Sequence, residues 1–311
     1  MKLFRQISNY IERFFKRQES DKSYGEILES RGAKIWYKIS GAERGPVTIF
    51  LHGGPGYNSY SFEKCVGPQL EKKLRMVYLD QRGSGRSIDV SPRGPVSLKA
   101  LIDDIEQIRI RSDFRNVNLI GHSFGGLVAL EYQRHYPSFV DKIILIDISF
   151  DLPACFQHQT DHAAKVFLEH TEAIEKIQSS DQPPFKKVQQ VSASVGTALF
   201  QKALLWSDSE NYQRYLKIGC ESKMQPGGSR LVRQLVRHNY LDSAHPELAG
   251  KIPVPALLLA GRHSQCIGVL NLQKASGQWG IPLIWFEKSG HFPYAEESEA
   301  FVETATAFLI G

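Results

Sequence analysis

Residues 117–130, Val-Asn-Leu-Ile-Gly-His-Ser-Phe-Gly-Gly-Leu-Val-Ala-Leu, change character halfway along. Residues 117–120 form a short apolar run rich in β-branched side chains, which predicts a buried strand. Residues 126–136 contain good helix formers and end before Pro137, which predicts a helix. Between the two, Gly121-His122-Ser123-Phe124-Gly125 has the pattern G-x-S-x-G. The stretch therefore predicts a serine on a sharp turn from strand to helix.

A turn of this kind holds its serine in a strained backbone conformation. The flanking positions must be glycine, because a Cβ atom would collide across the turn. The Ser123 hydroxyl should then stand above the carboxyl edge of the sheet, with the N-terminus of the helix beneath it. The competing interpretation is a glycine-rich loop whose serine has no chemical role.

A second glycine-rich loop follows the compact apolar strand predicted at residues 47–51. It reads His52-Gly53-Gly54-Pro55-Gly56. In this position backbone N–H groups can face a cavity and hold a developing oxyanion. A phosphate-binding loop is the alternative, but neither G-x-G-x-x-G nor G-K-[ST] occurs in this loop.

Strands and helices alternate through the first half of the chain. Residues 24–40 predict a β-hairpin, residues 75–79 and 142–147 predict strands, and residues 97–111 predict a helix with Ser97 as its N-cap. Continuously apolar strands that alternate with helices indicate a mostly parallel sheet covered on both faces.

The second half predicts an insertion in that sheet. Helical patterns dominate residues 151–249, and strand character returns at residues 255–260 and 281–286. We therefore expect a core made of residues 24–150 and 250–311, with residues 151–249 as a helical cap.

His291 is the strongest candidate for a general base among the ten histidines. A serine hydroxyl is a poor nucleophile at neutral pH and needs an imidazole within hydrogen-bond reach. His291 follows the last predicted strand and Gly290, in the chain order Ser … His. His52 is expected to shape its own loop, and His122 belongs to the turn that carries Ser123.

With these motifs assembled, residues 24–311 resemble the α/β-hydrolase fold. His52-Gly53-Gly54-Pro55-Gly56, together with Asp80-Gln81-Arg82-Gly83-Ser84-Gly85-Arg86-Ser87, is similar to the motifs of proline iminopeptidases and related serine peptidases. The resemblance implies Ser123 as nucleophile, His291 as base, and the backbone amides of Gly54 and Phe124 as oxyanion hole. It implies hydrolysis through an acyl-enzyme, with no metal and no organic cofactor.

Two positions depart from that family. Where the family carries its acid, in G-R-x-D, this chain reads Gly261-Arg262-His263-Ser264. The serine turn has Gly-His-Ser-Phe-Gly in place of the usual Gly-Gly-Ser-Trp-Gly, which favours general esterases, lactonases and dehalogenase-like hydrolases.

The missing carboxylate needs a replacement, because the acid orients the imidazole and stabilises its protonated form. Asp147 ends the strand after the serine turn and lies 24 residues beyond Ser123. Some haloalkane dehalogenases, on the same fold, carry their acid at a similar place. We therefore predict Asp147 as the acid, with Asp151 and Glu287 as alternatives, and expect Ser264→Ala to matter little. A turn-capping role for Asp147 is the competing interpretation.

The sequence indicates the substrate less clearly than it indicates the reaction, because the residues of the cap have more than one possible role. Five cap glutamates could bind a protonated N-terminus or simply form solvated helix faces: Glu169, Glu172, Glu175, Glu210 and Glu221. Five cap aromatics could line an apolar acyl pocket or belong to the core: Phe167, Phe200, Trp206, Tyr212 and Tyr215. The leading hypothesis is a serine hydrolase of small esters, lactones or amides. A proline iminopeptidase-type aminopeptidase and a non-catalytic binding protein on the same scaffold are the alternatives.

The length of 311 residues suits one large domain, or a core with an inserted subdomain, and the net charge of +5 is modest. A small-molecule substrate is the expected partner. The basic residues beyond the N-terminus are interleaved with acids, so no nucleic-acid partner is expected. Four scattered cysteines predict reduced thiols and a cytoplasmic protein. Residues 1–20 predict a basic amphipathic helix that packs on the domain, on a second copy, or on the inner, anionic surface of a membrane.

Overall fold

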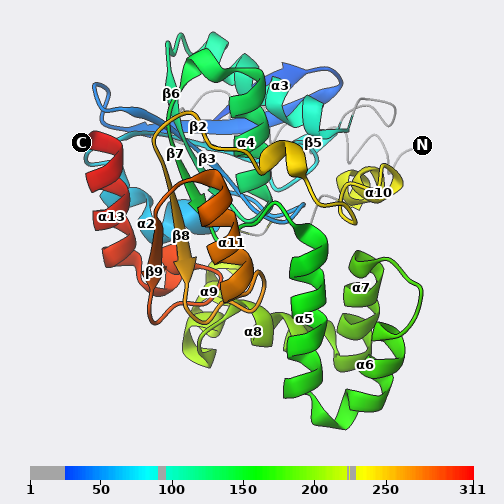
Figure 1. Ribbon diagram of the computed structural model, residues 1–311. Helices are drawn as coiled ribbons and strands as arrows, with labels where there is room; N and C mark the ends of the chain where they lie inside the picture. The colour runs from blue at the N-terminus through cyan, green and yellow to red at the C-terminus, as the bar shows by residue number, and fades with distance from the viewer. Residues whose placement is uncertain (1–24, 90–95, 223, 225–228) are drawn as a thin grey trace, which may run out of the picture.

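The computed structural model describes residues 25–89, 96–222, 224 and 229–311 (Figure 1). The amphipathic helix predicted for residues 1–20 lies outside these ranges. The strands are β1 (Glu26–Ser30), β2 (Ala33–Gly41), β3 (Val47–Leu51), β4 (Arg75–Leu79), β5 (Ile88–Asp89), β6 (Val117–His122), β7 (Val140–Ile146), β8 (Ala256–Gly261) and β9 (Leu283–Phe286). The helices are α2 (Tyr60–Leu70), α3 (Leu98–Arg111), α4 (Phe124–His135), α5 (Leu152–Val166), α6 (Thr171–Gln178), α7 (Pro184–Val195), α8 (Thr197–Leu205), α9 (Ser209–Glu221), α10 (Ser229–Arg237), α11 (Val269–Trp279), α12 (Pro293–Glu296) and α13 (Ser298–Ile310). Short 3-10 turns are η2 (Pro137–Phe139), η3 (Leu168–His170) and η4 (Pro246–Leu248).

The strands form one sheet in the order β1-β2-β4-β3-β6-β7-β8-β9, with β5 paired to β2. β1 and β2 make the predicted antiparallel hairpin, and β2 is also antiparallel to β4. Every pairing from β4 through β3, β6, β7 and β8 to β9 is parallel. The carboxyl ends of these strands therefore share one edge, where ligands bind in open α/β sheets.

The apolar side chains of each strand alternate between two cores. In β3, Ile49 and Leu51 belong to the core beneath α3, α4 and α11, whereas Phe50 belongs to the core beneath α2 and α13. In β6, Leu119 and Ile120 divide in the same way. Because a strand has a side-chain period of two, continuously apolar strands require helices on both faces, as predicted.

The helical region lies between β7 and β8 in the chain. Figure 1 shows α5, α6 and α7 gathered beyond the end of the sheet toward which the β8 arrow points. Two backbone hydrogen bonds join this region to loops at that edge: Gln265 N–H donates to the Leu204 carbonyl at 3.0 Å, and His291 N–H donates to the Leu205 carbonyl at 2.7 Å. The helical cap thus covers the carboxyl edge of the sheet.

The sequence patterns predict neither α2 nor α11. α2 contains Gly67 and Pro68, which interrupt a helical pattern. Its position is fixed by packing instead, because the Phe62 ring stacks on Phe50 of β3 with centroids 3.7 Å apart. The predicted cap at Ser97 is confirmed: its Oγ accepts a hydrogen bond from Ala100 N–H at 3.2 Å.

Candidate active site

The turn between β6 and α4 holds Ser123 in a rare backbone conformation. Ser123 has φ 51° and ψ −125°, which is strained for a residue with a side chain. A Cβ at Gly121 would lie 2.6 Å from the Gly125 carbonyl oxygen, and a Cβ at Gly125 would overlap the Leu51 carbonyl oxygen. Ser123 N–H donates to the Ile146 carbonyl at 2.9 Å. A side chain in place of Gly121 or Gly125 would therefore collide with the backbone across the turn, as the G-x-S-x-G pattern predicts.

The loop after β3 lies against this turn. A Cβ at Gly53 would lie 3.0 Å from both His122 Nδ1 and Ser123 Cβ, so only glycine fits there without displacement. Gly54 follows with φ +118°. Phe124 is the first residue of α4, where the backbone N–H has no acceptor within its own helix. The two amides predicted to hold an oxyanion thus come from segments in contact around Ser123.

His52 and Gln81 brace that loop. Gln81 N–H donates to His52 Nε2 at 2.9 Å, and Gln81 Nε2 donates to the His52 carbonyl at 2.6 Å. Burial lowers the pKa of His52, so the ring stays neutral and can accept this hydrogen bond. His52 shapes the loop, as the sequence analysis expects.

The turn after β4 is held by two ion pairs whose carboxylates are buried. The Asp80 carboxylate accepts hydrogen bonds from Ser59 N–H and Arg86 N–H, both at 2.8 Å, and from Arg86 Nε at 2.7 Å. Burial disfavours the charged carboxylate, but the Arg86 guanidinium outweighs it and lowers the pKa of Asp80. Arg82, fully buried, contacts Asp104 through Nε at 3.0 Å and Nη2 at 2.7 Å. The Asp80–Ser87 motif therefore supports the structure around it, through Ser59, Asp104 and the loop of His52.

The structure brings Asp147 and His291 together. Asp147 Oδ1 lies 3.2 Å from His291 Nδ1, and both side chains are buried. Asp147 is the first residue beyond β7 and has φ 49°. The contact is a close ion pair without good hydrogen-bond geometry at Nδ1. A carboxylate in this position can hold the imidazole with Nε2 directed away from it.

Ser264 contacts the same carboxylate. Its Oγ donates to Asp147 Oδ1 at 2.8 Å, and Gly261 N–H lies 3.3 Å from Asp147 Oδ2. Ser264 is 1% exposed, so the hydrogen bond is shielded from water. The residue that replaces the family's usual acid thus helps to hold the carboxylate on the neighbouring strand. This contact is not predicted from the sequence, although the place of Ser264 in the Gly261–Ser264 motif was a signal for it.

The two alternative acids are occupied elsewhere. Asp151 caps α5 by accepting from Ala154 N–H at 3.2 Å, and it pairs with Lys274 Nζ at 2.7 Å. Glu287 forms a bidentate ion pair with Arg262 on the surface, in which Nε donates to Oε2 at 3.0 Å and Nη2 donates to Oε1 at 2.7 Å. Of the three carboxylates considered, Asp147 alone contacts His291 in the structure.

His291 is an unusually basic buried histidine. Burial of its ring opposes protonation, but interactions with Cys266 and Asp147 outweigh burial and raise its pKa to about 10. Cys266 is a second neighbour that the sequence analysis does not connect to His291. The carboxylate at Nδ1 therefore has the effect required of a triad acid, since it stabilises the imidazolium.

His122 joins the serine turn to the loop of His291. Its Nε2 lies 2.9 Å from the His291 carbonyl oxygen, and the two rings are 4.7 Å apart. Burial and the charge of His291 hold the pKa of His122 well below its usual value. A neutral ring that donates from Nε2 thus ties the backbone of His291 to the residue that precedes Ser123.

The five cap glutamates considered as amine ligands are all exposed: Glu169, Glu172, Glu175, Glu210 and Glu221. This outcome supports the interpretation as solvated helix faces. Among the cap aromatics, Phe200, Trp206 and Tyr215 are buried in hydrophobic clusters, and Tyr215 also lines a cavity.

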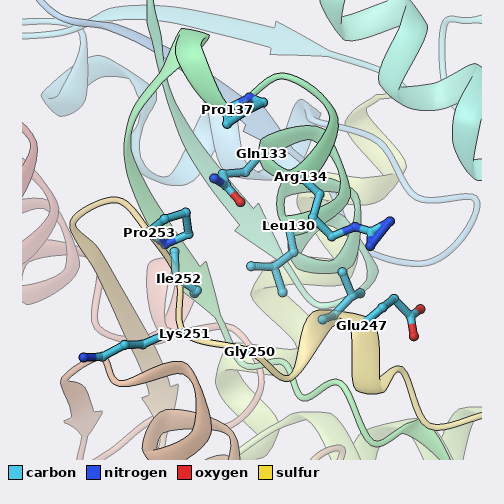
Figure 2. A pocket seen from close by; sticks show the side chains of 10 residues that line it. Leu130, Gln133, Arg134, Pro137, Glu247, Gly250, Lys251, Ile252 and Pro253 are labelled. Carbon is cyan, nitrogen blue, oxygen red and sulfur yellow. The ribbon is translucent and has the colours of Figure 1, made fainter.

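A cavity of about 320 Å³ lies far from these groups (Figure 2). It is formed by the last turns of α4, with Leu130 and Arg134, and by residues 250–253, which precede β8. Ser123 is at the opposite end of α4, so this cavity cannot present a ligand to it. Within the described ranges, no group of three or more His, Cys, Asp or Glu side chains could hold a metal ion.

The sequence family described as alpha/beta hydrolase fold matches residues 46–298. The chain belongs to this family. The hydrolase is 34% identical over 122 residues to the proline iminopeptidase PfmaB of Pestalotiopsis fici, which is 39% of this chain and 42% of that relative. It is 26% identical over 289 residues to the proline iminopeptidase of Heyndrickxia coagulans, covering 92% of this chain and 98% of the relative.

Solved structures agree on the fold of the hydrolase. The crystal structure of the proline iminopeptidase-related protein TTHA1809 from Thermus thermophilus superposes with a TM-score of 0.79 at 21% identity, covering 92% of this chain and 96% of that one. The predicted α/β-hydrolase fold is therefore confirmed. None of the helices in the described part of the chain combines the length and apolarity needed to cross a bilayer.

Proposed function

We propose that this hydrolase cleaves a small ester, lactone or amide through an acyl-enzyme on Ser123. His291 acts as the general base and Asp147 as the acid that orients it. The observation that carries the proposal is the 3.2 Å contact between Asp147 Oδ1 and His291 Nδ1 at the sheet edge that bears Ser123. Acyl transfer requires a serine nucleophile and a histidine base, and here the strained strand-to-helix turn of Ser123 and the ion-paired His291 stand at the same edge of the sheet.

Acylation begins with transfer of the Ser123 Oγ proton to His291 Nε2. Oγ attacks the substrate carbonyl carbon, and the carbonyl oxygen becomes an oxyanion held by the amides of Gly54 and Phe124. Collapse of the tetrahedral intermediate breaks the bond to the leaving group, which takes the proton from His291. The acyl group remains bonded to Ser123.

Deacylation repeats these steps with water. His291 accepts a proton from a water molecule, whose oxygen attacks the acyl carbon. The second tetrahedral intermediate expels Ser123 Oγ, which recovers its proton from His291. The Asp147 carboxylate stabilises the imidazolium in both half-reactions and stays ionised throughout.

The two alternative functions are less well supported. A binding protein on a hydrolase scaffold was suggested by the serine at position 264, but Asp147 supplies a carboxylate to His291. The proline iminopeptidases among its relatives favour an aminopeptidase. Against this, the five cap glutamates considered as ligands of a substrate amine are exposed to solvent.

A fluorophosphonate probe tests the proposal directly. Covalent labelling of Ser123, located by peptide mass spectrometry, is the expected result, and Ser123→Ala is the matched control. Hydrolysis of p-nitrophenyl acetate with an initial burst would support the acyl-enzyme. A folded protein that neither reacts with the probe nor cleaves the ester would exclude a serine hydrolase.

A further inference from the structure

A cavity of about 480 Å³ opens beside the oxyanion loop. One wall is residues 56–61, which begin two positions after Gly54, and includes Tyr57 and Tyr60. The other wall comes from α8, α9 and the residues that follow α9, with Tyr215 and Leu216 among them. The cavity therefore lies between the core and the cap, at the edge of the sheet that bears Ser123.

One aromatic ring separates this cavity from the catalytic imidazole. Phe292 follows His291, and the centroids of these two rings are 5.2 Å apart. The Phe292 ring lies 4.8 Å from Tyr215 and 6.5 Å from Tyr57, both of which line the cavity. Two residues of the cavity wall thus pack on the same aromatic ring that packs on the imidazole of His291.

The described lining of the cavity carries no carboxylate, ammonium or guanidinium group. Its buried hydroxyls are engaged with each other, since Ser61 Oγ and Tyr215 OH are 2.8 Å apart and Tyr215 OH lies 3.4 Å from Tyr294 OH. Tyr57 and Leu216 are 44% and 42% exposed and present apolar surface. Removing an ammonium group from water into such a site, with no paired carboxylate, is costly.

Glu296, a partly buried carboxylate near His291, has its oxygens occupied. One oxygen accepts from Ser207 Oγ at 2.6 Å and Ser207 N–H at 3.0 Å. The other accepts from Gly290 N–H at 2.9 Å. These bonds tie the cap to the loop of His291, and burial raises the pKa of Glu296. It is a structural link and not a free ligand for a substrate amine.

We propose that this cavity receives an uncharged, apolar acyl group and discriminates against acyl groups that carry an ammonium. The acyl part of a substrate stays at the oxyanion loop through both half-reactions, and one wall of the cavity is the continuation of that loop. The leaving group, by contrast, must depart before water attacks. This inference rests on the proposed serine hydrolase, and it makes an N-terminal aminopeptidase the less favoured substrate class.

The test compares p-nitrophenyl hexanoate with p-nitrophenyl 6-aminohexanoate, which differ by a terminal ammonium. We expect kcat/KM to be about 100-fold higher for the neutral ester. From acetate to hexanoate, kcat/KM should increase by about two- to fourfold for each added CH₂ group. A second series with a constant acetyl group and alcohols of increasing length should show no such increase.

Leu216→Asp adds a carboxylate to the cavity wall at an exposed helix position. We expect it to reduce the preference for the neutral ester by about tenfold, because the ammonium gains a partner. Leu199→Asp is the matched control, since Leu199 is 60% exposed on α8 and does not line the cavity. Each preference is a ratio measured on one protein sample, so it does not depend on the folded fraction.

The outcomes separate the cavity from the catalytic proposal. If acetate is cleaved and Ser123 is labelled, but neither chain length nor charge matters, the cavity proposal is overturned and the serine hydrolase stands. The cavity proposal is equally overturned if only the alcohol series responds. If no ester is cleaved, the cavity proposal is tested by calorimetric titration of the folded protein with hexanamide and with 6-aminohexanamide. Tighter binding of hexanamide supports the cavity, and equal or weaker binding overturns it.

Discussion

The ends of β7 and β8 meet through a carboxylate and a hydroxyl, whereas the proline iminopeptidases that this chain resembles carry their acid at the position of Ser264, after β8. Asp147, just after β7, supplies the carboxylate, and Ser264, after β8, supplies a hydrogen bond to it at 2.8 Å. The two strands are paired in parallel, with Ile146 opposite Leu259, and Asp147 N–H donates to the Leu259 carbonyl at 2.9 Å. Neighbouring strand ends therefore present two positions from which a carboxylate can reach one histidine.

The strongest test of this comparison removes the charge at the end of β7. Asp147→Asn should reduce kcat by about 10⁴-fold, because the imidazole loses the group that orients it and stabilises its protonated form. Steady-state kinetics on a p-nitrophenyl ester would measure the loss. The Glu287→Gln variant is the control and should retain activity, since Glu287 pairs with Arg262 on the surface. Near-normal turnover of Asp147→Asn would show that another group serves as the acid.

A double variant tests whether a carboxylate at position 264, after β8, can replace the carboxylate of Asp147. In the Asp147→Asn background, Ser264→Asp should restore activity by about tenfold to 100-fold, because the new carboxylate occupies the position used by the related peptidases. Ser264→Asn in the same background adds similar bulk without charge and should restore nothing. Failure of the aspartate to restore activity, in a variant with normal thermal stability, would mean that β7 alone has the required geometry.

The pH dependence of hydrolysis reports the neighbours of His291. Its pKa is raised by Cys266 and Asp147, so the imidazolium persists to higher pH, and only the neutral ring can accept the Ser123 proton. We therefore expect kcat/KM to increase by about tenfold per pH unit below that pKa. Asp147→Asn and Cys266→Ala should each move the rise to lower pH, because each removes an interaction that favours the imidazolium. A profile centred near the ordinary histidine value in the native protein would contradict the raised pKa.

Of the four changes predicted for this site, Ser264→Ala is expected to have the smallest effect on activity. Loss of one buried hydrogen bond to a carboxylate should cost about 1 to 3 kcal/mol of unfolding free energy and lower kcat several-fold. The structure thus revises the expectation that this substitution matters little. Because Ser264 positions Asp147, the variant should also shift the pH profile, whereas Ser264→Thr should preserve it. An unchanged profile would limit Ser264 to a role in stability.

Local sequence patterns predict the parts of the site in which close contacts within a few residues dictate the residue type. Gly121 and Gly125 are required where a strand turns directly into a helix around a serine, so this pattern predicts the turn once an apolar strand precedes it and a helix follows it. The strand that ends just before Asp147 is equally predictable, because its apolar run stops at a charged residue. The contact between Ser264 and Asp147 spans 117 residues in the chain, and periodicity carries no information about which loops meet.

The pairing of the strands and the packing of the cap decide which side chains meet at the site. The sequence by itself determined the α/β order, the serine turn and the glycine-rich loop, since these follow from local sterics and apolar patterning. It left three carboxylates as candidates for the acid. Only the tertiary structure decided that Asp147 and not Glu287 meets His291, that Ser264 and Cys266 join them, and that the cap glutamates face water. Those outcomes depend on strand register and on the packing of the cap against the sheet edge, which are set by contacts between distant segments.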